Sequence, residues 1–258
     1  MNQEIDLSKV IDIAKEAGKE ILEIYKQDFS VYEKEDASPL TEADKKSNDV
    51  ILKGLQAAYP DIPFISEEVK EKPFEERKDW KAFWLIDPLD GTKEFIKKNG
   101  EFTVNIALVE QGVPTIGVVY IPVEDKVFFA RRGEGAYRQV GSSAAERIQN
   151  PYHYNSKDHI VVVASRSHLS QEVIDFVESL KNQGKHVDFL SAGSSLKFCL
   201  VAEGKADVYP RFGPTMEWDT GAAHAIVLEA GKKVIRHDTG QALSYNKENL
   251  LNPWFIVE

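Results

Sequence analysis

Cysteine, long apolar runs and basic tracts are almost absent from this chain of 258 residues. Its single cysteine, Cys199, excludes an internal disulfide, which is typical of proteins from a reducing compartment. Because Cys199 lies in the apolar segment 196–202, we interpret it as a buried packing residue and not as a reactive thiol. The chain starts without a positively charged region followed by an apolar one, so we expect no signal peptide and a cytoplasmic location.

Hydropathy and charge exclude further classes of protein. No apolar run approaches the ~20 residues of a membrane span, so we expect no stable membrane insertion, and a loose peripheral contact with the inner membrane stays open. The net charge is −10 without a dense Lys/Arg tract, so a nucleic-acid polymer is not an expected partner. An anionic small molecule would have to be met by bound cations or by a local basic pocket. Monomer and homodimer both stay open.

The first part of the chain combines helices with an antiparallel sheet. Apolar residues recur at helical spacing in 7–25 and 41–59, which predicts two amphipathic helices. Strands are predicted at 64–66, 103–110, 113–120, 126–131 and 135–138. Short turns join the last four, which favours an antiparallel sheet packed on the two helices. The charged segment 69–81 is predicted to be a mobile surface loop.

The second part alternates between strand and helix. Strands are predicted at 159–165, 186–190, 206–209, 233–236 and 254–257, and helices at 170–181, 194–203 and 220–230. The segment 141–154 lacks a strong period and is the predicted boundary. We therefore predict an N-terminal α+β domain, 1–149, and a C-terminal α/β domain, 150–258.

An apolar run ends in two carboxylates within the segment 83–92, FWLIDPLDGT. Pro88 is predicted to end the strand because proline has no ladder donor. The turn that follows would let Asp87, Asp90 and the Thr92 hydroxyl face one point. Two carboxylates that close raise each other's pKa unless a cation lies between them, and Mg²⁺ prefers such oxygen ligands. The alternative is a solvated turn rich in aspartate.

Three more acids have a functional and a plain interpretation. Glu67 follows the strand 64–66, and it either joins the Asp87 rim through a neighbouring strand or begins a charged loop. Asp219 precedes a helix that opens with small residues, which favours close approach to a phosphate or metal, or it is simply the N-cap. Asp44, three residues after Thr41, fits a capping box.

Three motifs occur in a characteristic order: SEE at 66–68, DPLDGT at 87–92, and WD at 218–219 with LEAG at 228–231. Together they resemble the inositol monophosphatase superfamily of Mg²⁺-dependent, lithium-sensitive phosphatases, and the resemblance runs across essentially the whole chain. Within it, the segments 90–96, 99–107, 194–199 and 206–211 are similar to the branch of CysQ-type 3'(2'),5'-bisphosphate nucleotidases.

The resemblance implies a layered α-β-α-β-α sandwich and two or three Mg²⁺ ions per active site. The implied metal ligands are the side chains of Glu67, Asp87, Asp90 and Asp219 and the backbone carbonyl of Leu89. The residues implied to orient and deprotonate the attacking water are Asp44, Glu67 and Thr92. The residues implied to contact the substrate are Asp90, Gly91, Thr92, His168, Ser194, Lys197, Arg211 and Asp219.

The activity implied by the resemblance is hydrolysis of the 3'-phosphate of adenosine 3',5'-bisphosphate to AMP and phosphate. Without the resemblance, Lys197 and Arg211 would be ordinary solvated charges, and His168 a loop residue. An inositol monophosphatase or a sugar bisphosphatase would share all the metal residues. A haloacid-dehalogenase-type phosphatase would need two acids two positions apart, and a non-enzymatic nucleotide sensor would be expected to lack some of the acids.

Overall fold

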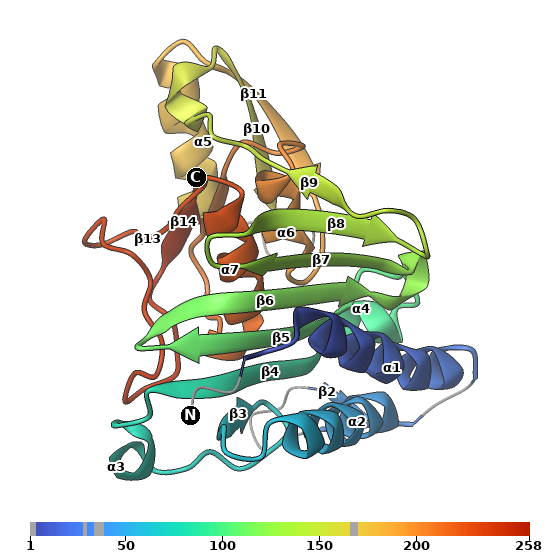
Figure 1. Ribbon diagram of the computed structural model, residues 1–258. Helices are drawn as coiled ribbons and strands as arrows, with labels where there is room; N and C mark the ends of the chain where they lie inside the picture. The colour runs from blue at the N-terminus through green and yellow to red at the C-terminus, as the bar shows by residue number, and fades with distance from the viewer. Residues whose placement is uncertain (1–3, 28–29, 34–38, 166–169) are drawn as a thin grey trace.

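The computed structural model describes residues 4–27, 30–33, 39–165 and 170–258 (Figure 1). His168 therefore lies outside the described residues. The two predicted N-terminal helices are confirmed as α1, Leu7–Tyr25, and α2, Glu42–Ala58. Asp6 caps α1 through the backbone N–H of Ser8, and Thr41 and Asp44 form the capping box of α2.

A seven-stranded sheet forms the centre of the molecule (Figure 1). Its strands follow the chain: β3 Phe64–Ser66, β4 Ala82–Asp90, β5 Thr103–Glu110, β6 Val113–Ile121, β7 Lys126–Arg131, β8 Gly135–Val140 and β9 Glu146–Ile148. The pair β3–β4 is parallel and the other pairs are antiparallel. A smaller antiparallel pair joins β1, Val31–Glu33, to β2, Pro39–Thr41.

Strand β4, which lies next to the edge strand β3, is buried on both faces, which explains its continuous apolar run. Phe83 and Leu85 lie in the hydrophobic cluster that includes α7, Gly221–Glu229. Trp84 and Ile86 point to the other face, in the cluster with α1 and α2. Successive strand residues alternate between faces, so a strand covered by helices on both sides must be apolar throughout.

Small residues let the helices approach the sheet closely. A Cβ atom on Gly117 of β6 would lie 2.0 Å from the carbonyl oxygen of Ala222 in α7. On the opposite face, a Cβ on Gly18 of α1 would lie 2.4 Å from the ring of Tyr120. Any larger residue would displace the helix, so glycine at these positions sets the distance between layers.

The C-terminal part adds the outer layers. Its strands are β10 His159–Ala164, β11 His186–Ser191, β12 Tyr209–Arg211, β13 Val234–Arg236 and β14 Phe255–Val257. Its other helices are α5 Gln171–Asn182 and α6 Leu196–Ala202. β10 and β11 are parallel, and β14 lies antiparallel between β12 and β13. The layers run from α1/α2 through the sheet, α6/α7 and the C-terminal strands to α5, which confirms the predicted α-β-α-β-α sandwich (Figure 1).

The prediction that Pro88 ends the strand is wrong. β4 continues to Asp90, and its pairing with β5 shifts register between Asp87 and Asp90. Pro88 falls within this irregular stretch, where the ladder needs no donor from it. The strand therefore carries both aspartates itself.

The prediction of a mobile surface loop at 69–81 is also wrong for residues 74–77. Residues Phe74–Arg77 form a short helix, α3, and the Arg77 side chain is fully buried. Its guanidinium donates to the backbone carbonyls of Lys72, Lys247 and Glu248. Charge composition alone did not reveal that one cation of this segment lies inside the protein.

Three further observations bear on the sequence expectations. The predicted burial of Cys199 is confirmed, and burial raises the pKa of its thiol. The largest hydrophobic cluster includes residues from both halves of the chain, such as Leu85 and Ile226, and the division at 149/150 stays a prediction. None of the helices in the described ranges has the length and apolarity required to cross a membrane.

Candidate active site

Three of the predicted acids meet at one end of the β3–β4 pair. Ser66 of β3 lies opposite Ile86 of β4, and the backbone N–H of Glu67 donates to the Ile86 carbonyl at 3.2 Å. This parallel register places Glu67 beside Asp87, and the two side chains share a hydrogen bond. Asp90 follows on the same strand. The predicted neighbouring strands are thus confirmed, and they deliver these acids to one edge of the sheet.

Asp219 reaches the same place from the second half of the chain. It ends the one-turn helix η3, Glu217–Asp219. The hydroxyl oxygen of Ser195 lies 2.8 Å from both Asp90 Oδ2 and the backbone carbonyl of Asp219, and the Ser195 N–H donates to Asp90 Oδ2 at 2.6 Å. Asn105 of β5 donates to the Ser195 hydroxyl at 3.0 Å. Ser195 therefore joins two acids that lie far apart in sequence.

The interpretation of Asp219 as the N-cap of the following helix is wrong. The N-cap residue of α7 is Thr220, and Asp219 Oδ2 instead accepts from the N–H of Met216, 2.9 Å away, within η3. The capping-box interpretation of Asp44 is confirmed, since Asp44 Oδ2 accepts from the N–H and the hydroxyl of Thr41. Its other oxygen, Oδ1, receives the hydroxyl of Thr92 at 3.1 Å, so capping leaves it available for a second contact.

Burial and mutual repulsion raise the pKa values of two of the acids. The pKa of Asp87 is raised well above its usual range, first by burial and then by the charges of Glu67, Asp90 and Asp219. Burial also raises the pKa of Asp219 strongly, with Asp90 and Glu67 adding to the effect. Carboxylates in such surroundings are stabilised by a cation placed between them. The raised pKa values of these neighbouring carboxylic acids therefore fit a site for a divalent metal ion.

The donor chemistry fits the same conclusion. The acids and the backbone carbonyl of Leu89, which lies 3.3 Å from the Thr92 hydroxyl, offer only oxygen ligands, as Mg²⁺ prefers. No three of the four predicted acids, all of which are described, bring ligand atoms within 4.8 Å of one another. The residues in the described part that do meet this spacing are His159, His186 and Asp188, and none of them lines the cavity described next.

A cavity of about 510 Å³ opens over the acids. It is lined by Glu67, Asp90, Gly91, Thr92, Lys93, Glu94, Pro214, Thr215, Met216, Asp219 and Leu251. An adjoining hollow shares Asp90 and Asp219 and adds Ser194, Lys197 and Arg211. The structure therefore brings most predicted substrate residues to one opening, next to the predicted metal ligands.

Lys197 is buried and not solvated. Its Nζ donates to the carbonyl of Ser194 at 2.7 Å and lies over the ring of Tyr209, 5.4 Å from the centroid. The pKa of Lys197 is lowered to about 8, mainly by burial; the charge of Asp90 opposes this shift and the charge of Arg211 adds to it. A bound anion would favour the charged form of Lys197, and the charged lysine would in turn stabilise a bound phosphate.

Arg211 and Ser194 complete the basic side. Arg211 Nη2 donates to the carbonyl of Pro214 at 2.8 Å, and its Nε is buried without a hydrogen-bond partner among the described residues. The Ser194 hydroxyl is buried and unpartnered in the same sense. Ser194 has φ +42° and faces Gly91, whose missing Cβ would lie 3.3 Å from the Ser194 Cβ. Arg211 Nε and the Ser194 hydroxyl are therefore both buried polar groups with an unused capacity for a hydrogen bond within the described part of the chain.

Sequence reasoning missed several residues of this site. Ser195 falls within the segment 194–199, which gave it no individual role, although it contacts two of the acids. Asn105, which is 1% exposed and donates to Asp90 and Ser195, looked like one polar residue in a strand. Glu217, which is fully buried beside Trp218 and Asp219, gave no signal. Of these residues, only Asn105 could have been found from the sequence, because it is a polar residue inside an otherwise apolar strand.

Comparison with known proteins identifies the family. The model of the inositol monophosphatase family matches residues 3–254. This chain belongs to that family. The family assignment excludes the haloacid-dehalogenase alternative. It also agrees with the fold, since an IMPase from Thermotoga maritima superposes with a TM-score of 0.75 at 24% identity over 98% of this chain and 91% of that chain.

More similar members of the family share one name. The 3'(2'),5'-bisphosphate nucleotidase CysQ of Salmonella typhimurium is 46% identical over 97% of this chain and 98% of that protein. The protein of the same name from Escherichia coli K12 is 44% identical with the same coverage. The crystal structure of CysQ from Bacteroides thetaiotaomicron has a TM-score of 0.86 and 48% identity, covering 98% of this chain and 96% of that chain.

Proposed function

We propose that this protein is a Mg²⁺-dependent phosphatase that removes the 3'-phosphate from adenosine 3',5'-bisphosphate, giving AMP and phosphate. The observation that carries the proposal is the meeting of two opposite charge environments in one opening. The acids lie on one side, and Lys197 and Arg211 lie on the other. A substrate with two phosphates suits such a site. The relatives named bisphosphate nucleotidases at 44–48% identity support the same choice.

The acidic side is proposed to hold the metal ions. Glu67, Asp87 and the Leu89 carbonyl would hold one, and Asp87, Asp90 and Asp219 would hold a second. When bound, Mg²⁺ supplies charge neutralisation at the phosphate and a water of lowered pKa. The protein's own contribution is to fix these oxygens, through the β3–β4 register and through Ser195.

The attacking water is proposed to be oriented by Thr92, Asp44 and Glu67. A hydroxyl has one proton, and we assign that of Thr92 to Asp44 Oδ1 at 3.1 Å, the nearer of its two acceptors, the other being the Leu89 carbonyl at 3.3 Å. The remaining lone pairs of the Thr92 oxygen accept a hydrogen bond from the water. Asp44 is 1% exposed and thus acts in a place shielded from solvent. General-base assistance of this kind contributes typically 10²–10⁴-fold to a rate.

The basic side is proposed to hold the second phosphate and the nucleotide. Lys197 and Arg211 provide charge, and Arg suits bidentate contact with phosphate oxygens. Ser194 adds a hydroxyl without a partner in the described part of the chain. His168 stays a predicted contact, because it lies outside the described residues. The proposed partner is therefore a small phosphorylated nucleotide.

The serious alternative is an inositol monophosphatase or a sugar bisphosphatase, because these share the metal ligands. The test measures phosphate release from adenosine 3',5'-bisphosphate, its 5'-phosphosulfate relative, inositol 1-phosphate and fructose 1,6-bisphosphate, with Mg²⁺, with EDTA and with lithium. We expect the nucleotides to have by far the highest kcat/KM, with loss of activity in EDTA and inhibition by lithium. Preference for inositol 1-phosphate would support the alternative, and no release from any substrate would favour a sensor.

A further inference from the structure

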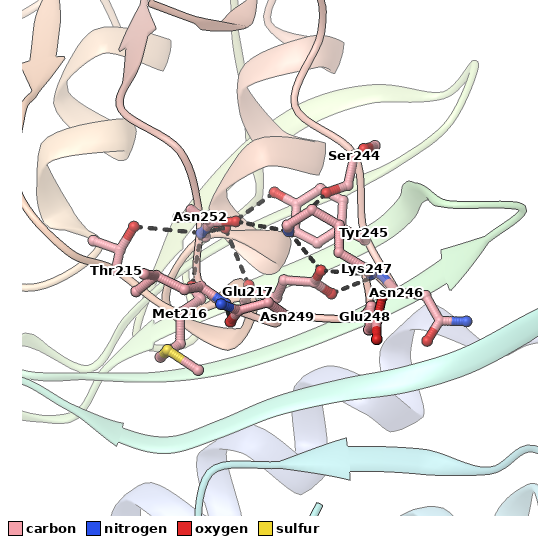
Figure 2. Close-up of polar contacts among 12 residues, drawn as sticks. Thr215, Met216, Glu217, Ser244, Tyr245, Asn246, Lys247, Glu248, Asn249 and Asn252 are labelled. Atoms are coloured by element: carbon pink, nitrogen blue, oxygen red, sulfur yellow. Dashed lines mark hydrogen bonds and ion pairs between the residues drawn. The ribbon is translucent and has the colours of Figure 1, made fainter. Parts of the chain in front are cut away.

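A loop near the C-terminus lies between two fully buried charged residues. The carboxylate of Glu217 accepts from the backbone N–H groups of Asn246 and Lys247, at 2.7 and 3.0 Å, and from Lys247 Nζ at 2.6 Å (Figure 2). Glu217 is 0% exposed and is two residues from Asp219. One side chain thus holds both the main chain and the ammonium group of the loop.

Arg77 holds the same loop from the other side. Its Nη1 donates to the Lys247 carbonyl at 2.6 Å and to Asn246 Oδ1 at 2.9 Å, and its Nη2 donates to the Glu248 carbonyl at 2.9 Å. The amide of Asn246 donates back to the Arg77 carbonyl at 2.7 Å. Arg77 belongs to the segment that runs from Glu67 to the start of β4.

The far end of the loop is fixed to η3. The side-chain amide of Asn252 donates to the carbonyl of Met216 at 2.8 Å (Figure 2). It also donates to the hydroxyl of Thr220 at 3.1 Å. The N–H of Glu217 donates to the Leu250 carbonyl at 2.9 Å. The turn that presents Asp219 is therefore tied to the loop before, within and after η3.

We infer that the loop 244–252, hereafter the strut, sets the position of Asp219 relative to Glu67, and that Glu217 and Arg77 are positioning residues for the metal site. The inference rests on the proposed function, since it assumes that Asp219 and Glu67 bind metal. A buried ion pair adds little net stability because both charges lose their hydration. Its effect is to fix one geometry, and metal affinity is sensitive to such supporting contacts.

The test replaces Glu217 by Gln and measures Mg²⁺ binding by calorimetry and the Mg²⁺ dependence of turnover. We expect Mg²⁺ affinity to fall about tenfold, in line with the loss of a contact behind a metal ligand. The KM for the nucleotide at saturating Mg²⁺ should change less than about threefold, because the substrate contacts stay in place. Arg77→Lys should shift the Mg²⁺ curve in the same direction.

A matched control is Glu203→Gln. The Glu203 side chain is 3% exposed and its carboxylate pairs with Arg138 at 2.8 Å, outside the strut and the cavity. Both variants lose a buried carboxylate, and urea midpoints report the stability each loses. An unchanged Mg²⁺ affinity in Glu217→Gln, or an equal shift in the control, overturns the inference. If Glu217→Gln does not fold, Lys247→Met replaces it in the same Mg²⁺ titration, because this variant removes the ammonium group and leaves the main-chain contacts of Glu217 in place. An unchanged Mg²⁺ affinity in Lys247→Met then overturns the inference.

Failure of the proposed function would give a different result. Wild-type protein that binds Mg²⁺ but releases no phosphate from any substrate would contradict the function and leave the calorimetric test of the strut intact. Wild-type protein that binds no Mg²⁺ would overturn both.

A separate group of ligands lies on the parallel pair β10–β11. His159 of β10 stands opposite His186 of β11, and Asp188 follows two positions later on the same face. Asp188 Oδ2 lies 2.8 Å from His159 Nε2, and Asp188 Oδ1 lies 3.6 Å from His186 Nε2. One ligand atom from each residue lies within 4.8 Å of the others. Tetrahedral Zn²⁺ with bonds of about 2.0–2.2 Å places its ligands about 3.3 Å apart.

The geometry points to a surface site for a borderline divalent ion such as Zn²⁺, distinct from the proposed Mg²⁺ site. Two imidazoles and one carboxylate suit Zn²⁺, whereas Mg²⁺ prefers oxygen ligands. The three side chains are between 56% and 74% exposed, so an ion reaches them without opening the fold. An ion held here would connect the two strands at their first residues.

The test is a Zn²⁺ titration by calorimetry with saturating Mg²⁺ present, which occupies the oxygen site. We expect the double variant His159→Ala/His186→Ala to lose one Zn²⁺ equivalent, or at least about 100-fold in affinity, since even contacts behind a ligand are worth 10–100-fold. His237→Ala, another exposed histidine outside the group, serves as the control and should bind like the wild type. Equal binding by the double variant and the wild type overturns the proposal.

Discussion

The acidic and basic sides of the cavity carry charges of opposite sign, and burial disfavours the charged form of the groups on both sides. On the acidic side, burial and mutual repulsion raise the pKa of Asp87 and Asp219. On the basic side, burial lowers the pKa of Lys197 to about 8. Without a bound ion of opposite charge, burial therefore favours the neutral form of the ionisable groups on each side. A divalent cation would relieve the first and a phosphate would relieve the second.

The two sides also differ in how the fold supplies them. Three acids stand at the ends of adjacent strands, β3 and β4, where the sheet register fixes their spacing. The basic residues come from α6 and from the end of β12, in a different layer. Damage to the acidic side should therefore stop the chemistry, whereas damage to the basic side should weaken recognition of the second phosphate.

The largest expected effect comes from Asp90→Asn. A metal ion contributes several kcal/mol to the transition state and each 1.36 kcal/mol is tenfold, so we expect turnover to fall about 1000-fold or more. Steady-state phosphate release measures the effect, and circular dichroism checks the fold. Asp238→Asn removes an exposed carboxylate that pairs with Arg236, and it should leave turnover unchanged. Activity of Asp90→Asn within a few-fold of wild type would contradict the metal assignment.

Thr92→Val should have the next largest effect. It keeps the shape of the side chain but removes the hydroxyl that is directed to Asp44, so the water loses its orientation. We expect kcat to fall about 100-fold with little change in KM, which initial rates over a range of substrate concentrations measure. Thr92→Ser retains the hydroxyl and should recover most of the rate. Equal activities of the valine and serine variants would show that the hydroxyl has no part in the reaction.

Lys197→Ala tests the basic side. We expect the KM for the bisphosphate to rise about tenfold or more, because a charge-assisted contact to the second phosphate is lost. The KM for a simple monophosphate should change much less. Lys232→Met removes another buried lysine, whose Nζ contacts the Tyr152 carbonyl, and serves as the control. Similar losses on both substrates would assign Lys197 a role in the shared chemistry.

The smallest effect should be visible in the pH dependence. The free enzyme keeps Lys197 charged below its pKa of about 8 and loses this charge as the pH rises through that value. The KM for the bisphosphate should then rise by up to about tenfold per pH unit, until it reaches the value of Lys197→Ala. Rates at several substrate concentrations between neutral pH and mildly alkaline pH measure the inflection. An inflection that persists in Lys197→Ala would belong to another group.

Much of the scaffold followed from local sequence. The boundaries of α1 were predicted correctly because the spacing of apolar residues is a local signal. The strands β5 to β7 followed from alternating or apolar runs between short turns for the same reason. Asp87 and Asp90 were visible as acids because carboxylates at the end of an apolar strand break its pattern.

The contacts that complete the site were not local. Ser195 lies 105 positions from Asp90 along the chain, and no spacing rule connects them. The burial of Arg77 depends on carbonyls about 170 positions later. The prediction that Pro88 ends the strand fails because the rule for proline assumes regular pairing, whereas the register of β4 shifts at that point.

The sequence alone determined which chemistry is available, namely oxygen ligands at strand ends, and it determined the periods of the helices and strands. Only the tertiary structure decided that Lys197 is buried enough for its pKa to fall, that Ser195 joins two acids, and that a loop near the C-terminus holds the Asp219 turn. Periodicity and capping act over a few residues, whereas burial and long-range hydrogen bonds depend on how distant layers pack.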